Sequence, residues 1–431
     1  MRLWAAIAIL LILSCGMALA DEEYSFDLSE IEEKPLHIGG YLEFRPVLFG
    51  LDTDSALYKL KLYGRDKENV REEYNFTALL DGSYKMGTTE FRAIVNTDLR
   101  KSYLGWSEET TLYEGYMSLR PSSTFNLNMG KKTLKWGTGY AWNPVAFLDR
   151  PKDPYDPELA REGFVVASAD YIKSFDGPLK TFSFTPVLMP VYDHINDDFG
   201  KINRLNFAGK TYFLLYDTDI DLLFLTGQSK TNRYGMDFSR NITSNFEIHG
   251  ELALINDYKK SFINSDGAVF NNEYDATNYL LGLRYLTESD TTYIFEFFHD
   301  ATGFARSEMT DYFSFIDRGY DTYLTSGDDS LLKKASNITE GSYNRKNPMR
   351  DYLYLRVSKK EPFDILYFTP SATGIFNTND KSFSVGPELL YTGVKNLELR
   401  LRTNFLIGDS YTEYGEKQND FWIGLRVRYY F

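Results

Sequence analysis

Hydrophobic and polar residues alternate along the final stretch of the chain, from Asp420 to Phe431. Successive side chains of a β-strand point to opposite faces, so a period of two sorts them onto two surfaces. One surface is apolar throughout and consists of Phe421, Ile423, Leu425, Val427, Tyr429 and Phe431. The other carries Gly424, Arg426 and Arg428. The pattern predicts a strand with hydrocarbon on one side and water on the other.

The same two-faced pattern recurs upstream, as in the stretches that begin at Arg204 and at Asn396. Short turn signals separate such stretches at residues 86–87, 121–123, 176–178, 217–219, 241–244, 288–290, 360–362 and 393–395. Longer polar connections alternate with them, at 50–71, 136–162, 258–274 and 301–347 among others. A closed antiparallel barrel with both chain ends on one side needs an even strand number, and these turns predict about 18 strands, within a range of about 16 to 20.

Composition agrees with a membrane barrel. Aromatic residues make up 16% of the 431 residues, with 33 Tyr and 32 Phe, although mean hydropathy is only −0.37. Lipid-facing apolar residues, aromatic girdles and a polar lumen produce this mixture. Beyond the N-terminal stretch no run of about eighteen apolar residues occurs, so no transmembrane helix is expected. We therefore predict an all-β, antiparallel transmembrane β-barrel over residues 35–431, with short periplasmic turns and long outer loops; the alternative is a large periplasmic β-protein.

The N-terminus predicts export. Met1 and Arg2 precede an apolar stretch, and Ala18-Leu19-Ala20 forms a small-x-small cleavage site, so residues 1–20 are expected to be a signal peptide. Cys15 leaves open a lipoprotein cleavage site instead. Residues 21–34 are expected to be a short periplasmic segment, too small to form a plug domain.

Two sequence motifs resemble those of a known group. A strand that ends on the final aromatic residue resembles the C-terminal signature of bacterial outer-membrane β-barrels, which makes Tyr429 and Phe431 the expected assembly signal. The segment 130–139, G-K-K-T-L-K-W-G-T-G, leads into an Asn-Pro loop and resembles a motif of porin-like outer-membrane proteins of Gram-negative bacteria. The opening segment 26–46 is similar to that of uncharacterised members of this group. The resemblance implies the outer membrane of a Gram-negative bacterium as the location.

A lumen of charged residues is the candidate site. Alternation and barrel closure place six side chains on the inner wall as expected pore-lining residues: Glu43, Arg45, Arg400, Arg402, Arg426 and Arg428. The proline-rich loop after residue 130 could fold inward against this wall, since opposite charges across a narrow pore orient solutes. Its expected constriction residues are Trp136, Asn143, Asp149, Asp153, Asp156 and Glu158. In the alternative, Trp136 and Trp142 are interface aromatics, and the arginines simply pair with Glu388 and Glu398.

Other chemistry is sparse. Glu247, His249 and Glu251 share one strand face and could bind a divalent cation, but barrel lumens are polar in any case, so no metal site is predicted. Four scattered histidines and the absence of a nucleophile motif argue against an enzyme. No cofactor is expected, and no c-type haem motif occurs.

The function expected from these features is passive diffusion of small hydrophilic solutes through an outer-membrane channel. Two alternatives stay open: a selective transporter of hydrophobic or carbohydrate substrates, and a barrel scaffold or sheath for an envelope complex. The expected partners are outer-membrane lipid, the barrel-assembly machinery and small solutes. The net charge of −14 argues against nucleic acid. The sequence leaves the oligomeric state open.

Overall fold

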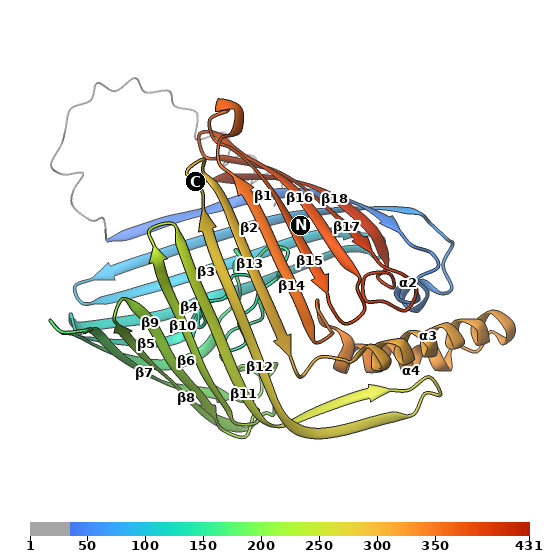
Figure 1. The fold of residues 1–431 in the computed structure, drawn as a ribbon, viewed down its shortest axis with the longest axis horizontal. Helices are drawn as coiled ribbons and strands as arrows, with labels where there is room; N and C mark the ends of the chain where they lie inside the picture. The colour runs from blue at the N-terminus through green and yellow to red at the C-terminus, as the bar shows by residue number, and fades with distance from the viewer. Residues whose placement is uncertain (1–34) are drawn as a thin grey trace. The chain divides into compact units, whose positions relative to one another are not determined.

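The structure, a computed structural model, describes residues 35–431. The expected signal peptide and the segment 21–34 lie outside the described residues. In the described part an 18-stranded antiparallel sheet forms, in which each strand pairs with the next along the chain and β18 pairs with β1 (Figure 1). The last pairing closes the sheet into a barrel. The predicted fold class and strand number are confirmed.

The strands are β1 (Leu36–Leu51), β2 (Val70–Met86), β3 (Thr89–Ser102), β4 (Gly105–Ser122), β5 (Phe125–Lys132), β6 (Phe164–Ser174), β7 (Leu179–Val191), β8 (Arg204–Leu215), β9 (Thr218–Thr226), β10 (Arg233–Thr243), β11 (Phe246–Ile263), β12 (Val269–Leu286), β13 (Thr291–Asp300), β14 (Asp351–Lys359), β15 (Phe368–Asn377), β16 (Phe383–Val394), β17 (Leu397–Ile407) and β18 (Asn419–Tyr430). The helices are α2 (Ala56–Leu62), α3 (Arg306–Ser326), α4 (Ser330–Ile338), η2 (Thr339–Tyr343) and η3 (Pro362–Asp364). In the described part of the chain, none of these helices has an apolar stretch long enough to cross a bilayer.

The pairing of β1 with β18 closes the barrel and keeps the side chains that were predicted to face inward on the same side of the sheet. Glu43 lies opposite Arg428 across the β1–β18 pair. At the chain end, the N–H of Phe431 donates to the carbonyl of Gly40 and the N–H of Gly40 donates to the carbonyl of Phe431, both at 3.2 Å. Phe431 is therefore hydrogen-bonded to β1 directly after the end of β18. A slip of one residue would exchange the two faces of β18.

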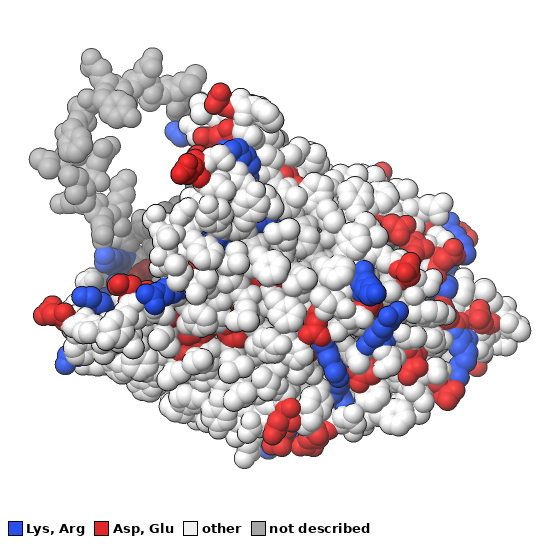
Figure 2. Space-filling model, viewed as in Figure 1, with Lys and Arg blue, Asp and Glu red and all other residues white. Residues whose placement is uncertain are grey.

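The outward face of the barrel is apolar. Leu425 is 43% exposed whereas its neighbour Arg426 is only 5% exposed, because the first points outward and the second inward. Exposed apolar side chains occur all around the barrel, among them Phe44, Phe76, Leu80, Met129, Leu205, Leu281, Leu355, Leu389 and Phe405. Figure 2 shows charged residues gathered mainly toward the strand ends, with a largely uncharged surface between them. Such a band suits a hydrocarbon environment.

The two ends of the barrel differ. At one end, here called the turn end, the connections are the short turns that the sequence predicted, and η3 lies in one of them. The opposite end, the loop end, carries the connections 52–69, 133–163, 192–203, 301–350 and 408–418. Other connections at the loop end are short, including those between β3 and β4 and between β15 and β16.

Three of the predicted polar connections have more structure than expected, and the first of them, 50–71, contains α2. The segment 258–274 is not a loop, because β11 and β12 extend as a hairpin in which Tyr258 pairs with Tyr274 and the rings of Phe262 and Phe270 stack with centroids 5.4 Å apart. Cross-strand aromatic pairs of this kind stabilise strands beyond the barrel wall. The connection 301–350 contains α3, α4 and η2.

Two apolar cores fill the loop end of the interior on one side. One joins Met309, Phe313 and Ile316 of α3 to inward side chains of β11 to β15, and it includes Trp142. The other joins Trp136, Val145, Phe147 and Leu148 to inward side chains of β6 to β9 and of β11. Burial of apolar surface thus holds residues of the 133–163 connection inside the barrel. The interior beside β16 to β18 and β1 to β5 remains polar.

Candidate functional site

The connection 133–163, here called the inner loop, begins with a turn closed by its own aspartate. The carboxylate of Asp149 accepts hydrogen bonds from the backbone N–H groups of Leu134 at 3.0 Å, Lys135 at 3.1 Å and Trp136 at 2.9 Å. These three backbone N–H groups come shortly after β5 and pair with no described strand, so the carboxylate supplies the hydrogen-bond acceptors that a buried backbone needs. Asp149 thus shapes the loop and contacts no wall residue through these bonds.

Glu251 of β11 fixes the next part of the inner loop. Its carboxylate accepts from the N–H groups of Thr138 and Gly139, both at 2.7 Å, and from that of Val145 at 3.2 Å. The side-chain amide of Asn143 also donates to it, at 3.0 Å. Hydrogen bonds to a buried charged acceptor are among the strongest in proteins.

The glycines of the W-G-x-G motif make room for this carboxylate. Gly137 has a φ of 91°, and a Cβ atom there would lie 2.7 Å from a Glu251 oxygen. A Cβ atom on Gly139 would lie 2.1 Å from the carbonyl oxygen of Trp142. A side chain at either position would displace the loop from the wall.

Glu296 of β13 provides a second wall anchor. It is fully buried and accepts from the N–H of Ala141 at 2.9 Å and from that of Tyr140. His249 contacts the same carboxylate through Nε2 at 3.0 Å. Next along the loop, the Trp142 ring stacks on Phe298 with centroids 5.1 Å apart. The inner loop is therefore tied to β11 and β13 by both polar and aromatic contacts.

Asp156 ties the far part of the inner loop to the opposite wall. Its carboxylate lies 2.8 Å from Arg426 of β18 and 3.2 Å from Arg402 of β17. Burial raises the pKa of Asp156, but these two guanidinium groups outweigh that effect and hold the pKa well below its usual range. The loop therefore crosses the lumen, with one part fixed to β11 and β13 and another to β17 and β18.

The arginines on this wall are matched by carboxylates. Arg428 lies 2.6 Å from Glu43, and Arg426 lies 3.3 Å from the same residue. Around them, Arg400 pairs with Glu398 at 3.0 Å. Glu388 contacts Arg356, Arg400 and Arg402. Arg45 is the most loosely held of the predicted wall arginines, with its Nε 3.9 Å from Glu43. The wall is thus a network of ion pairs rather than a row of free cations.

Open space remains between the inner loop and the strands β1 to β4. One cavity of about 390 Å³, the outer cavity, is lined by residues near the loop end, including Asn75, Asp98 and Arg100. A second of about 700 Å³, the inner cavity, is lined closer to the turn end, by Asp81 and Arg92 among others. A further cavity of about 430 Å³ beside β5 to β8 shares Lys132 and Trp136 with the inner cavity. The lumen is therefore hollow on this side.

Several solved barrels share this architecture. No protein-family model and no curated protein matches the chain in sequence. The structure of Pseudomonas aeruginosa OccK2 (OpdF), in complex with glucuronate, matches with a TM-score of 0.51 and 10% identity, over 92% of this chain and 96% of that one. Pseudomonas aeruginosa OccK5 (OpdH) matches with a TM-score of 0.50 and 13% identity, over 91% of this chain and 97% of that one. The fold is that of a porin-like outer-membrane barrel. At these identities the likeness concerns the fold alone.

The residues predicted for the constriction have different positions in this porin-like barrel. Trp136, Asn143, Asp149 and Asp156 lie inside the barrel, in the contacts described above. Asp153 pairs with Lys346 of the 301–350 connection, and exposed Glu158 lines the inner cavity. Trp136 and Trp142 belong to interior cores and not to an outer aromatic belt. A constriction role for these residues stays a prediction.

Sequence reasoning missed the two wall anchors. Glu251 was considered only as a cation ligand, but its oxygens are used by the inner loop. His249 instead lies between Glu247, at 3.6 Å, and Glu296. A glutamate on an inward face gives no local signal of which backbone amides it will meet.

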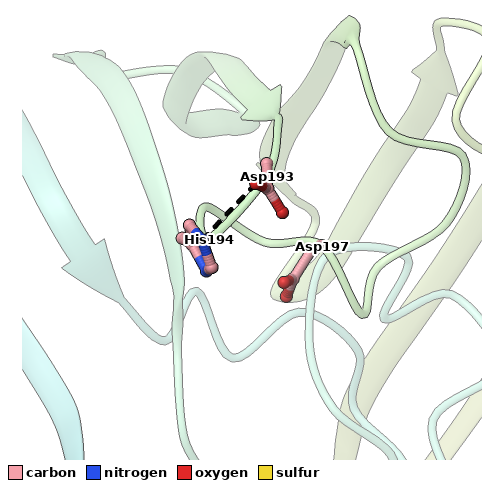
Figure 3. Close-up of side chains that lie close together, drawn as sticks. All are labelled: Asp193, His194 and Asp197. Carbon is pink, nitrogen blue, oxygen red and sulfur yellow. Dashed lines mark ion pairs between the residues drawn. The ribbon is translucent and has the colours of Figure 1, made fainter.

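A cluster of exposed side chains at the loop end was also missed. Asp193, His194 and Asp197 of the 192–203 connection have potential ligand atoms within 4.8 Å of one another (Figure 3). His194 lies 3.4 Å from Asp193. All three are exposed, and exposed acidic groups commonly gather without an ion, so we assign no metal to them.

Glu413 is a buried acid of the 408–418 connection and does not belong to a strand of the barrel. Its carboxylate accepts from the Tyr352 hydroxyl at 2.6 Å and from Asn377 at 2.8 Å. Burial raises the pKa of Glu413 to about 7; Lys417, 3.8 Å away, opposes the shift and Asp380 adds to it. The Glu413 carboxyl group therefore titrates near neutral pH.

We expect packing of the 408–418 connection to depend on pH. The folded pKa of Glu413 lies above its unfolded value of about 4.3, so this group stabilises the packed connection fully below that value. The stabilisation is lost as pH rises through about 7. Amide hydrogen exchange of residues 408–418, corrected for intrinsic chemistry, should accelerate over that interval. Glu413→Gln should remove this acceleration. The control is Asp409→Asn, at an exposed residue of the same connection, which should retain it. If the exchange profile of Glu413→Gln were unchanged, Glu413 would not be the titrating group.

Proposed function

We propose that the protein is a channel of the outer membrane of a Gram-negative bacterium, through which small hydrophilic solutes diffuse passively. The observation that carries this proposal is the hollow polar side of the lumen. The outer and inner cavities, of about 390 and 700 Å³, lie beside a loop that is fixed across the barrel. A fixed loop narrows a pore without filling it.

The surroundings of the barrel support the same proposal. Outer-membrane lipid would contact the apolar outward face, and barrel-assembly machinery would insert the chain. With short turns in the periplasm, the loop end would face outward. We propose a channel rather than an enzyme, since the carboxylates Glu43, Asp156 and Glu251 of the lumen are used in ion pairs and in holding the loop.

The test is conductance of the purified, folded protein in a planar bilayer with no added partner. We expect discrete single-channel steps and uptake of a small polar solute by proteoliposomes. Glucuronate, which is bound in the OccK2 structure, is a suitable first solute. Protein that inserts and shows the heat-dependent gel shift of a folded barrel, but conducts no ions, would reject the channel and favour a scaffold in an envelope complex.

A further inference from the structure

The outer and inner cavities adjoin each other. Four residues line both cavities: Tyr41 of β1, Tyr113 of β4, and Leu159 and Ala160 of the inner loop. We propose that solutes cross the barrel at this junction, here called the neck, between the inner loop and the strands β1 to β4. This inference rests on the proposed function, and it assigns the path and the residues that select among solutes.

The opposite side of the inner loop holds less open space. Beside β14 to β18, the cavity lined by Tyr155, Arg356 and Arg402 has a volume of only about 10 Å³. A cavity needs about 10–15 Å³ to hold even one water molecule. The Tyr155 hydroxyl lies 3.3 Å from that of Tyr414, and the Asp156 ion pairs lie next to it. A cavity of about 180 Å³ between β17, β18, β1 and β2 shares Arg45 and Asn75 with the outer cavity. The path that we propose therefore follows the outer and inner cavities, on the β1 to β4 side of the inner loop.

The excess of charge changes sign across the neck. In the lining of the outer cavity, acidic residues outnumber basic ones: Glu43, Asp98, Glu108 and Glu109 against Arg45, Arg100 and Arg428. In the lining of the inner cavity, basic residues outnumber acidic ones: Arg92, Lys132, Lys135, Lys152 and Arg161 against Asp81, Glu114 and Glu158. A solute that crosses the neck thus leaves an acidic vestibule and enters a basic one.

Basic side chains of the inner cavity that have no carboxylate partner in the described part of the chain set the selectivity for the charge of the solute. Among the described residues, Lys132, Lys135 and Arg161 have no carboxylate oxygen within 4.0 Å. The arginines beside Asp156 and Glu43, in contrast, are neutralised at short range. A charge on the lining of a narrow path is screened only weakly over a few ångströms. The inner cavity therefore holds the anionic group of a small solute, and the reversal of charge across the neck makes the ionic current asymmetric with voltage.

Matched tryptophan substitutions test the path. Ala160 is exposed at the neck, whereas Ser183 lines the adjoining cavity beside β5 to β8 and neither of the two cavities that share the neck. We expect Ala160→Trp to lower single-channel conductance by about half or more and Ser183→Trp to lower it much less, since the narrowest segment dominates resistance. Equal losses, or a loss in Ser183→Trp alone, would overturn the neck assignment. If the unsubstituted protein does not conduct, the proposed function fails instead.

A charge reversal tests the selectivity without adding bulk. Lys135 is exposed, and its hydrogen bond to Asp149 is donated by its backbone N–H, so a change of side chain leaves that bond in place. Lys135→Glu should move the reversal potential in a salt gradient toward cation preference and reduce the asymmetry of the current–voltage curve. Lys333→Glu, on the exposed face of α4, lines neither cavity and should change neither property. An unchanged reversal potential in Lys135→Glu would overturn the role of the inner cavity.

Discussion

Replacing Glu251 and Glu296 together with alanine should raise single-channel conductance about twofold or more and make the current noisy, because the inner loop would lose its attachment to the barrel wall. Glu251 receives hydrogen bonds from Thr138, Gly139, Asn143 and Val145, and Glu296 receives them from Tyr140 and Ala141. A hydrogen bond to a charged group contributes about 1.5–3 kcal/mol. Without the two carboxylates, the backbone N–H groups of the inner loop would hydrogen-bond to water, and the loop would move away from β11 and β13.

The matched control for this variant is Glu247→Ala. Glu247 lies on the same face of β11 as Glu251 and contacts His249 and Ser239, but none of its hydrogen bonds reaches the inner loop. We expect nearly unchanged conductance for this variant. The anchoring role would be wrong if the double variant, folded and inserted as judged by its gel shift, conducted as the unsubstituted protein does.

Deleting Phe431, or replacing it with aspartate, should sharply reduce the amount of folded protein in the outer membrane. We expect an assembly role for this residue because it ends the apolar face of β18. It also exchanges two backbone hydrogen bonds with Gly40 at the seam where the barrel closes. A charge at the outward face of this seam would oppose insertion. The measurement is the fraction of heat-modifiable protein in membrane fractions.

A lumen-facing substitution separates the assembly signal from general damage to β18. The Tyr430 hydroxyl donates to Glu398 at 3.1 Å on the inner side, so Tyr430→Phe removes that bond and leaves the outward face intact. Its membrane level should stay near normal. Normal accumulation of the Phe431 deletion would mean that Tyr429 and Phe431 are not the assembly signal.

The sequence by itself determined the local features of the barrel. Alternation with a period of two is a property of neighbouring residues, so it assigned Leu425 outward and Arg426 inward without knowledge of any partner strand. Turn chemistry is equally local, and it gave the short connections and hence the strand number. An even number of strands is what a closed barrel with both chain ends on one side needs, and closure brings Glu43 beside Arg428.

Only the tertiary structure decided what the charged residues do. Asp156 meets Arg426 across 270 positions of the chain, and Glu251 meets Thr138 across 113. Such contacts depend on the strand register summed around the barrel and on the path of the inner loop, and no local pattern contains either quantity. The same reason explains why α3 was not predicted: its apolar side chains pack against inward residues of β11 to β15, which closure brings near. The 258–274 hairpin was missed although its Phe262–Phe270 pair is local. The pattern of faces therefore predicted the wall, whereas three-dimensional packing set where the loop lies, which charges are neutralised and where space remains.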